Sequence, residues 1–156
     1  VVMRGNNVMT GYFDDKDATD TAFKGGWFHS GDLAVWHPDG YIELQDRAKD
    51  IIISGGENIY STQVEAASYE HPAVLEAAVI GVPDDEWGES VKAVVVLQPG
   101  ASATEQEIID TAREHLASYQ KPKSVDFVDS LPKAPTGKIL KRELKDPYWK
   151  EQDRKV

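Results

Sequence analysis

The alternation of hydrophobic and polar residues divides the chain into short strands in its first third and longer elements after it. Residues 41–44 alternate as a strand with one side facing a core, whereas residues 91–97 form an apolar run typical of a buried strand. Apolar residues then recur at helical spacing, which predicts an amphipathic helix over 104–118 with a capping box of Thr104 and Glu107.

The remaining elements follow from similar patterns and from glycine and proline breaks. The element order predicts an α+β fold: a small C-terminal domain with a β-hairpin and a three-stranded sheet packed by helices. A β-rich section in residues 1–45, too small to hold a core alone, precedes it. We expect a short helix over 14–23, a strand over 27–36 interrupted at Gly31, a hairpin over 51–60, a helix from a cap at Ser61 or Thr62 to about residue 71, strands over 74–82 and 124–128, and a closing helix over 139–146.

Composition adds limits to this picture. The chain has 156 residues, of which 40% are hydrophobic and 28% charged, as expected for one folded domain or a domain plus a fragment. No apolar run approaches the ~20 residues of a membrane span. Cysteine is absent, which excludes thiolate chemistry and fits a reducing cytoplasm. The chain begins at Val1 in a strand-like stretch, so we expect it to be a piece of something longer.

Charge is distributed unevenly. The net charge of −10 argues against a nucleic-acid or membrane-surface protein. Residues 1–120 hold 7 basic and 21 acidic side chains, whereas residues 121–156 hold 10 basic and 6 acidic ones. Part of this excess is interpreted as a solvated basic tail, formed by Lys150, Arg154 and Lys155. The other cations are candidates for an anionic ligand: Lys121, Lys123, Lys133, Lys138, Lys141 and Arg142.

The most specific candidate is Lys138, in the Pro-Thr-Gly-Lys stretch of residues 135–138. Prolines and a glycine shape a loop there, and a lysine on such a loop can reach a phosphate or a carboxylate. The surrounding residues do not form a P-loop, because Pro132 and Ile139 stand where that motif needs Gly and Ser or Thr. We therefore expect Lys138 to deliver its charge to a site built by another part of the protein.

Three further stretches are weaker when each is taken alone. Asp32 follows a glycine and could bind a cis-diol such as a ribose, or it could only stabilise a turn. Asp46 and Arg47 begin a charged stretch that could be a solvated turn or a joint between two bodies, with Arg47 on a ligand. The Gly55-Gly56-Glu57 stretch could be only a hairpin turn, or it could let the backbone lie against an extended ligand.

Taken together, these stretches resemble the adenylate-forming superfamily, which contains acyl-CoA and aryl-CoA synthetases, peptide-synthetase adenylation domains and firefly luciferase. The matching text is GWFHSGDL at 26–33, DRAKDIIISGGENIY at 46–60 and LPKAPTGKI at 131–139. The Gly-Gly-Glu-Asn-Ile form of the second motif is similar to that of acyl-CoA synthetases, and it favours CoA over a carrier-protein thiol.

The resemblance implies an ATP-dependent acid–CoA ligase with a carboxylic acid, ATP and CoA as its substrates. Lys138 would bridge the attacking carboxylate and the α-phosphate, and Asp32 with Arg47 would hold the ribose. Asp46 would be the hinge of a mobile C-terminal domain. Gly55, Gly56 and Glu57 would line the pantetheine tunnel.

The resemblance also implies that residues 1–45 end a large N-terminal adenylation domain and that residues 46–156 form the mobile C-terminal domain. The pyrophosphate loop, the acyl pocket and the Mg²⁺ ligands would belong to the missing N-terminal part, so no metal site is expected in this chain. The chain alone is therefore expected to be inactive. Two alternatives remain open: a stand-alone nucleotide- or CoA-binding module, and a non-CoA adenylating enzyme.

Overall fold

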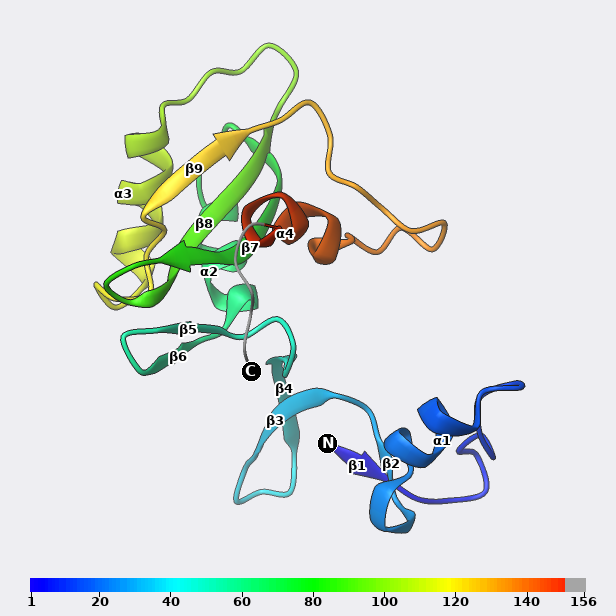
Figure 1. Cartoon of the computed structure of the whole chain (residues 1–156). Coiled ribbons are helices and arrows are strands. Elements are labelled where there is room, and N and C mark those ends of the chain that lie inside the picture. The colour runs from blue at the N-terminus through cyan, green and yellow to red at the C-terminus, as the bar shows by residue number, and fades with distance from the viewer. Residues whose placement is uncertain (151–156) are drawn as a thin grey trace. The chain divides into compact units, whose positions relative to one another are not determined.

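The computed structural model describes residues 1–150, so Arg154 and Lys155 of the expected basic tail lie outside the described residues. The chain divides into two compact units, Val1–Lys49 and Asp50–Val156 (Figure 1). The boundary expected from the resemblance, between residues 45 and 46, concerns the domains of a longer enzyme and stays a prediction.

The first unit contains two separate two-stranded antiparallel sheets rather than the single meander that the pattern suggests. The expected break at Gly31 is confirmed, because a left-handed glycine with φ of 77° separates two strands. The sheets pair β1 with β2 and β3 with β4. The elements are β1 (Val2–Met3), α1 (Lys16–Ala22), the 3₁₀ turn η1 (Lys24–Gly26), β2 (Phe28–His29), β3 (Asp32–Trp36) and β4 (Ile42–Arg47).

The second unit contains a five-stranded sheet with the order β6-β5-β8-β7, in which β9 also pairs with β8. The β8–β9 pair is parallel and the others are antiparallel. Ser54 pairs with Gly88, and this contact joins the expected hairpin to the three expected strands in one sheet. The elements are β5 (Ile52–Ser54), β6 (Glu57–Ile59), α2 (Ser61–Tyr69), β7 (Val74–Asp84), β8 (Gly88–Leu97), α3 (Glu105–His115), β9 (Ser124–Phe127) and α4 (Lys141–Trp149).

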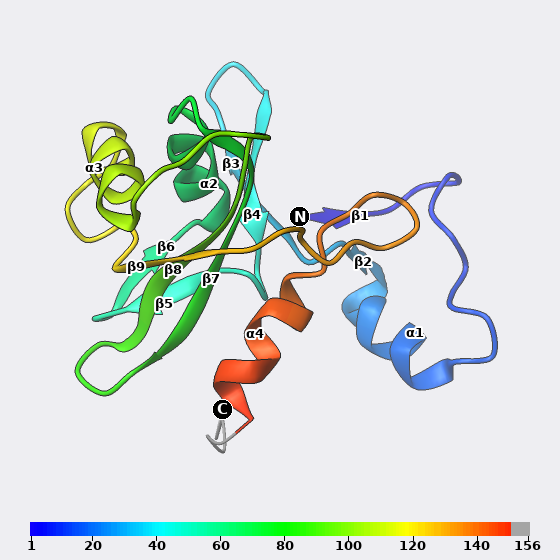
Figure 2. The same cartoon turned by 90° about the horizontal axis from the view of Figure 1, so that it is seen from above.

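Successive side chains of a strand point to opposite faces of a sheet. In this sheet, an apolar cluster covers each face. On one face Val79 and Val95 pack with Val64 of α2 and Ile108 of α3. On the other face a second cluster around Ile80 packs against residues from the last part of the chain. Figure 2 shows α3 and α4 on opposite sides of the sheet. The second cluster includes Ala78, Val82, Val94, Val96 and Leu131, with Val128, Ile139 and Leu144 against it.

Helix starts confirm one prediction and correct another. The capping box of α3 is present, with the Thr104 hydroxyl accepting from Glu107 N and the Glu107 carboxylate accepting from Thr104 N. The expected cap of α2 at Ser61 or Thr62 is wrong: Tyr60 is the N-cap residue and makes no side-chain capping bond. Ser61 is fully buried, and its hydroxyl accepts a hydrogen bond from Lys141 instead.

Helix α2 also contacts the outer edge of β7 through two polar side chains. The Tyr69 hydroxyl accepts from Ala77 N at 3.1 Å, and the Glu65 carboxylate accepts from Val79 N at 2.9 Å. Among residues 1–150, β7 pairs with no strand other than β8, so α2 satisfies backbone donors that the sheet leaves open.

Candidate active site

Lys138 lies on a short closed loop between β9 and α4. Ala134 N donates to Lys138 O at 2.8 Å, Gly137 N to Ala134 O at 2.8 Å, and Leu140 N to Pro132 O at 2.8 Å. Gly137 has a φ of 83°, a backbone conformation that residues with a Cβ atom rarely adopt. These bonds give the loop a defined shape while the Lys138 side chain remains exposed.

The base of the loop is fixed to the sheet. Leu131, only 5% exposed, belongs to the second apolar cluster, and Ile139 packs against that cluster. Lys133 forms an ion pair with Glu76 of β7. The loop is therefore anchored at its stem, and the exposed Lys138 follows directly after the Ala134–Gly137 turn at its far end.

Unlike Lys133 and Lys141, which lie near it in the sequence, Lys138 has no acidic partner within residues 1–150. Lys123 pairs with Asp84 at 3.3 Å, and Lys141 pairs with Glu65 at 2.7 Å. Within residues 1–150, the Lys138 ammonium makes no hydrogen bond or ion pair. The same holds for Lys121 in that range, whereas Arg142 lies 3.9 Å from Asp146. Four of the six candidate cations therefore pair with carboxylates of the chain, namely Lys123, Lys133, Lys141 and, at the longest distance, Arg142.

Asp32 and Arg47 lie opposite each other in the β3–β4 pair. Arg47 Nε is 3.4 Å from Asp32 Oδ1, with both side chains partly exposed. The other carboxylate oxygen of Asp32 accepts no hydrogen bond from residues 1–150. The two residues expected to bind a ribose are therefore neighbours, and one carboxylate oxygen is open to a hydroxyl donor.

Asp46 is the one buried residue of the first unit, at 9% exposure. It lies near the end of β4, opposite Leu33, and its Oδ1 accepts from Arg47 N at 2.7 Å. The interpretation of this stretch as a wholly solvated turn is wrong at Asp46. Its role as a hinge stays a prediction, and it stands three residues before the boundary between the compact units.

Gly55 and Gly56 form the turn of the β5–β6 hairpin, with φ of 59° and 86°. A Cβ on Gly55 would come within 2.7 Å of the Trp87 ring, whereas a Cβ on Gly56 would meet nothing within 4 Å. Gly55 N also donates to Trp87 O at 2.9 Å. Position 55 therefore needs glycine, because any larger residue would collide with the Trp87 ring. On the outer side of the turn, Gly56 and the exposed Glu57 leave space for a ligand.

Trp87 was not singled out in the sequence, because it appears there only as part of an acidic turn. The turn is held by Asp84, whose Oδ1 accepts from Glu86 N and Trp87 N at 3.0 Å each. The hydrogen bond from Trp87 lowers the pKa of Asp84, with the bonds from Glu86 and Lys123 acting the same way. The Lys123 ammonium also lies 5.3 Å from the centre of the Trp87 ring. The sequence signal that could have pointed to Trp87 is a tryptophan in a turn between Asp84 and Gly88.

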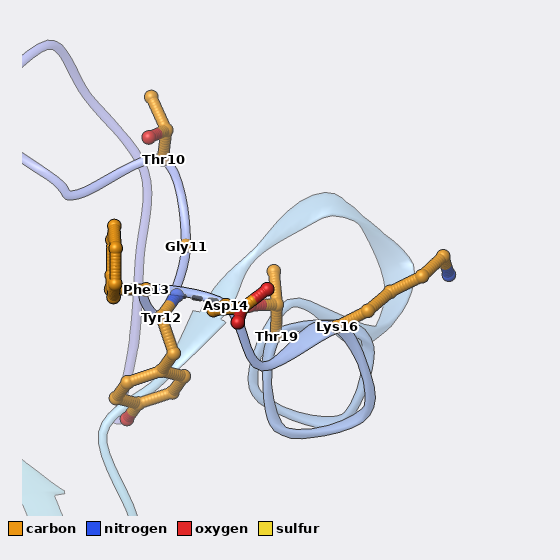
Figure 3. Close-up of a pocket in the computed structure, with 7 residues that line it drawn as sticks. All are labelled: Thr10, Gly11, Tyr12, Phe13, Asp14, Lys16 and Thr19. Atoms are coloured by element: carbon orange, nitrogen blue, oxygen red, sulfur yellow. Dashed lines mark hydrogen bonds between the residues drawn. The ribbon is translucent and has the colours of Figure 1, made fainter.

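The first unit also has an open pocket, lined by Tyr12, Phe13, Lys16 and Thr19 among others (Figure 3). Tyr12 N donates to Thr19 Oγ1 at 2.9 Å there, and the Phe13 side chain is fully exposed. It contains none of the expected site residues. The part of the chain that the structure describes has no group of three acidic or histidine side chains able to hold a metal ion. No described helix is long and apolar enough to cross a membrane.

Comparison with known proteins agrees with this arrangement. Residues 63–138 match the family described as the AMP-binding enzyme C-terminal domain. The chain is 51% identical over 149 residues to a probable CoA ligase, CCL11, of Humulus lupulus, covering 94% of this chain and 26% of that protein. The chain thus spans about a quarter of the length of this relative.

Two solved structures are also similar. ATP-bound MatB from Rhodopseudomonas palustris is 38% identical with a TM-score of 0.86, over 94% of this chain and 29% of that one. The o-succinylbenzoate CoA synthetase MenE from Bacillus subtilis, in complex with its acyl-adenylate intermediate, is 39% identical with a TM-score of 0.86, over 93% and 30%.

The fold and these matches define a C-terminal domain of the AMP-binding enzymes. More narrowly, the chain is similar over 94% of its length to the C-terminal portion of adenylate-forming enzymes that are named CoA ligases. The expected α+β fold and family are therefore confirmed.

Proposed function

We propose that this chain supplies the lysine-bearing part of an ATP-dependent acid–CoA ligase. The complete enzyme would convert a carboxylic acid and ATP to an acyl-adenylate and pyrophosphate. The CoA thiol would then attack the acyl carbon, forming the thioester and releasing AMP. The substrates of the whole protein are thus a carboxylic acid, ATP and CoA.

One observation carries this proposal: Lys138 stands exposed on an anchored loop and lacks an acidic partner within residues 1–150, while Lys133 and Lys141 beside it are paired. A positive charge that the chain does not neutralise internally is available to an external anion. In the first half-reaction two anions, the carboxylate and the α-phosphate, must approach each other. An ammonium between them offsets their repulsion and stabilises the charge that develops on the phosphoryl oxygens.

The other site residues take supporting roles in this proposal. Asp32 accepts hydrogen bonds from the ribose hydroxyls and Arg47 orients its carboxylate, which the 3.4 Å approach of the two side chains supports. Asp46 serves as the hinge between an N-terminal domain ending at residue 45 and a mobile domain from 46 to 156. Gly55, Gly56 and Glu57 border the path of the pantetheine arm, since the outer side of their turn is open.

The test uses the longer enzyme that carries this chain. Lys138→Ala is expected to lower the rate of adenylate formation by about 100-fold or more, because a transition-state charge contact is lost. Thioester formation from a supplied acyl-adenylate should stay within about threefold, since that step does not use the lysine. Lys150→Ala, which removes an exposed cation of the solvated tail, is the matched control and should leave both rates unchanged. Equal losses in both half-reactions of Lys138→Ala would refute the role of Lys138.

The 156-residue chain by itself is expected to form no acyl-CoA, because no residues for the pyrophosphate or the acyl group are assigned to it. Turnover by the purified chain would contradict this expectation. Calorimetric titration with CoA and with AMP separates the ligase from a stand-alone binding module, which should bind one of them tightly. CoA dependence of the whole enzyme separates it from a non-CoA adenylating enzyme. A cytoplasmic location and a role in fatty-acid metabolism stay predictions.

A further inference from the structure

Lys141, the first residue of α4, is unusual in its position. A helix N-terminus carries partial positive charge, so a cation there is unfavourable unless an acid compensates it. The Lys141 side chain is nevertheless only 14% exposed. Leu140, the N-cap residue of α4, makes no side-chain capping bond. Local helix energetics therefore do not explain why a lysine occupies this position.

The contacts of the Lys141 ammonium lie on other elements. Nζ is 2.7 Å from Glu65 Oε1 and donates to Ser61 Oγ at 2.6 Å, both on α2. The same oxygen of Glu65 accepts from Val79 N of β7 at 2.9 Å. Glu65 is 18% exposed and Ser61 is fully buried, so this network is largely shielded from water. One ammonium thus joins the start of α4 to a helix and a strand of the core.

The far end of α4 is also attached to the sheet. Trp149 Nε1 donates to Gly81 O at 3.1 Å. The Tyr148 hydroxyl donates to Asp126 of β9, which in turn accepts from Lys92 Nζ at 2.7 Å. The helix is therefore held at both ends. Lys138 lies three residues before Lys141, the residue at which the helix begins.

Directional polar bonds fix a position more narrowly than apolar packing does. Apolar contacts of Ile139 and Leu144 hold α4 against the sheet, but such contacts are non-directional. A shielded ion pair adds little net stability compared with apolar residues of similar size, although it can specify one arrangement. The Lys141 network thus suits the placement of the loop better than the stability of the core.

We infer that Lys141 is a positioning residue for Lys138, an inference that rests on the proposed function. Through Glu65 and Ser61, the Lys141 ammonium fixes the junction between the loop and α4, and thereby the place from which Lys138 reaches the reacting groups. Lys141 does not touch the substrate.

The first experiment measures the two half-reactions in the longer enzyme with Lys141→Met, which keeps the chain length and removes the charge. Adenylate formation is expected to fall about 10- to 100-fold in kcat, because a misplacement near 1 Å costs about that much. Thioester formation from a supplied acyl-adenylate should stay within about threefold. Lys141→Arg should restore most of the lost rate, since it keeps the charge and the donors. Lys150→Met, at the other end of α4 and exposed, removes a cation of the solvated tail and should change neither rate.

The outcomes separate this inference from the proposed function. Normal adenylate formation in Lys141→Met together with loss in Lys138→Ala would overturn the positioning role alone. Normal adenylate formation in Lys138→Ala would overturn the proposed function. Equal losses of both half-reactions in Lys141→Met would show a structural role and would also overturn the inference.

A second readout uses the 156-residue chain and needs no activity. Hydrogen exchange of the Ala134, Gly137 and Leu140 amides reports opening of the loop, and exchange of the Val95 amide reports the core. In Lys141→Met the loop amides should exchange about tenfold faster while Val95 is unchanged. If this variant does not fold, the Glu65→Gln/Lys141→Met double variant removes both charges and keeps an acceptor for Val79 N. Loop exchange equal to that of the parent chain, in either folded variant, would overturn the inference.

Discussion

The two compact units form sheets by the same backbone pairing, but only the second surrounds its sheet with buried side chains. All 21 buried hydrophobic residues in the described range lie between Ile52 and Leu131. In the first unit Trp36 is 78% exposed, Tyr41 76% and Leu44 66%, and Asp46 is the one buried residue. Paired strands without a covered face are marginal in water. Burial, more than strand pairing, therefore distinguishes the two units, and the apolar core that supports folding lies in the second unit.

The largest test of this difference compares two large-to-small substitutions. Ile108→Ala in α3 is expected to lower the free energy of unfolding by about 2–5 kcal/mol, because Ile108 is fully buried in the main cluster. Trp36→Ala removes a larger side chain from the first unit but should change the free energy of unfolding by no more than about 0.5 kcal/mol. Urea denaturation followed by circular dichroism measures both. A loss in Trp36→Ala as large as that in Ile108→Ala would contradict the comparison.

A smaller effect is expected from the helix caps. Thr104→Ala breaks the capping box of α3 and should lower the free energy of unfolding by about 1 kcal/mol. Asp15 caps α1 by accepting from Ala18 N at 2.9 Å, and Asp15→Ala is the matched change in the first unit. It should leave the main transition unmoved, since α1 buries no residue. Thermal melts followed at 222 nm, a wavelength sensitive to helix, would reveal a shift in Asp15→Ala if α1 were coupled to the core.

The smallest expected effect concerns pH. Burial acts to raise the pKa of Asp126, but the hydrogen bonds from Lys92 and Tyr148 outweigh it and hold the pKa below its usual range. A lowered pKa stabilises the fold above the unfolded value of about 3.9, and the stabilisation is lost as the pH falls below it. Asp126→Asn should therefore flatten the decline of unfolding free energy below about pH 4.

Glu43 provides the control for the pH experiment. The hydrogen bond from His37 lowers the pKa of Glu43 as well, but Glu43 is an exposed residue of the first unit. Glu43→Gln should leave the acid limb of the unfolding curve as it is in the parent chain. Urea titrations at a series of pH values would count against the comparison if the two variants flattened the limb equally.

The sequence predicts best what nearby residues determine. The hairpin at Gly55-Gly56, the capping box at Thr104 and the exposed loop of Lys138 each follow from a few adjacent residues, because turn and cap chemistry is local. The resemblance supplied Asp32 and Arg47 as a pair. Their placement on opposite strands depends on the β3–β4 register, which includes a bulge after Leu33 that no local pattern indicates.

The misses have non-local causes. Ser61 looked like a helix cap, but its hydroxyl is used by Lys141, which is 80 residues away in the chain. The hairpin and the three later strands looked separate because their union depends on one pair, Ser54 with Gly88. The contact of Trp87 with Gly55 was missed for the same reason, since it appears only after that union brings the two turns together.

The polar contacts of α2 with β7 have a consequence for the behaviour of the protein in concentrated solution. An open sheet edge is a template on which a strand of another molecule can add, and this is a common start of aggregation. Along β7 the Ala77 and Val79 donors are already occupied by Tyr69 and Glu65. A foreign strand would have to displace α2 before it could pair there, so this edge is protected from edge-to-edge association.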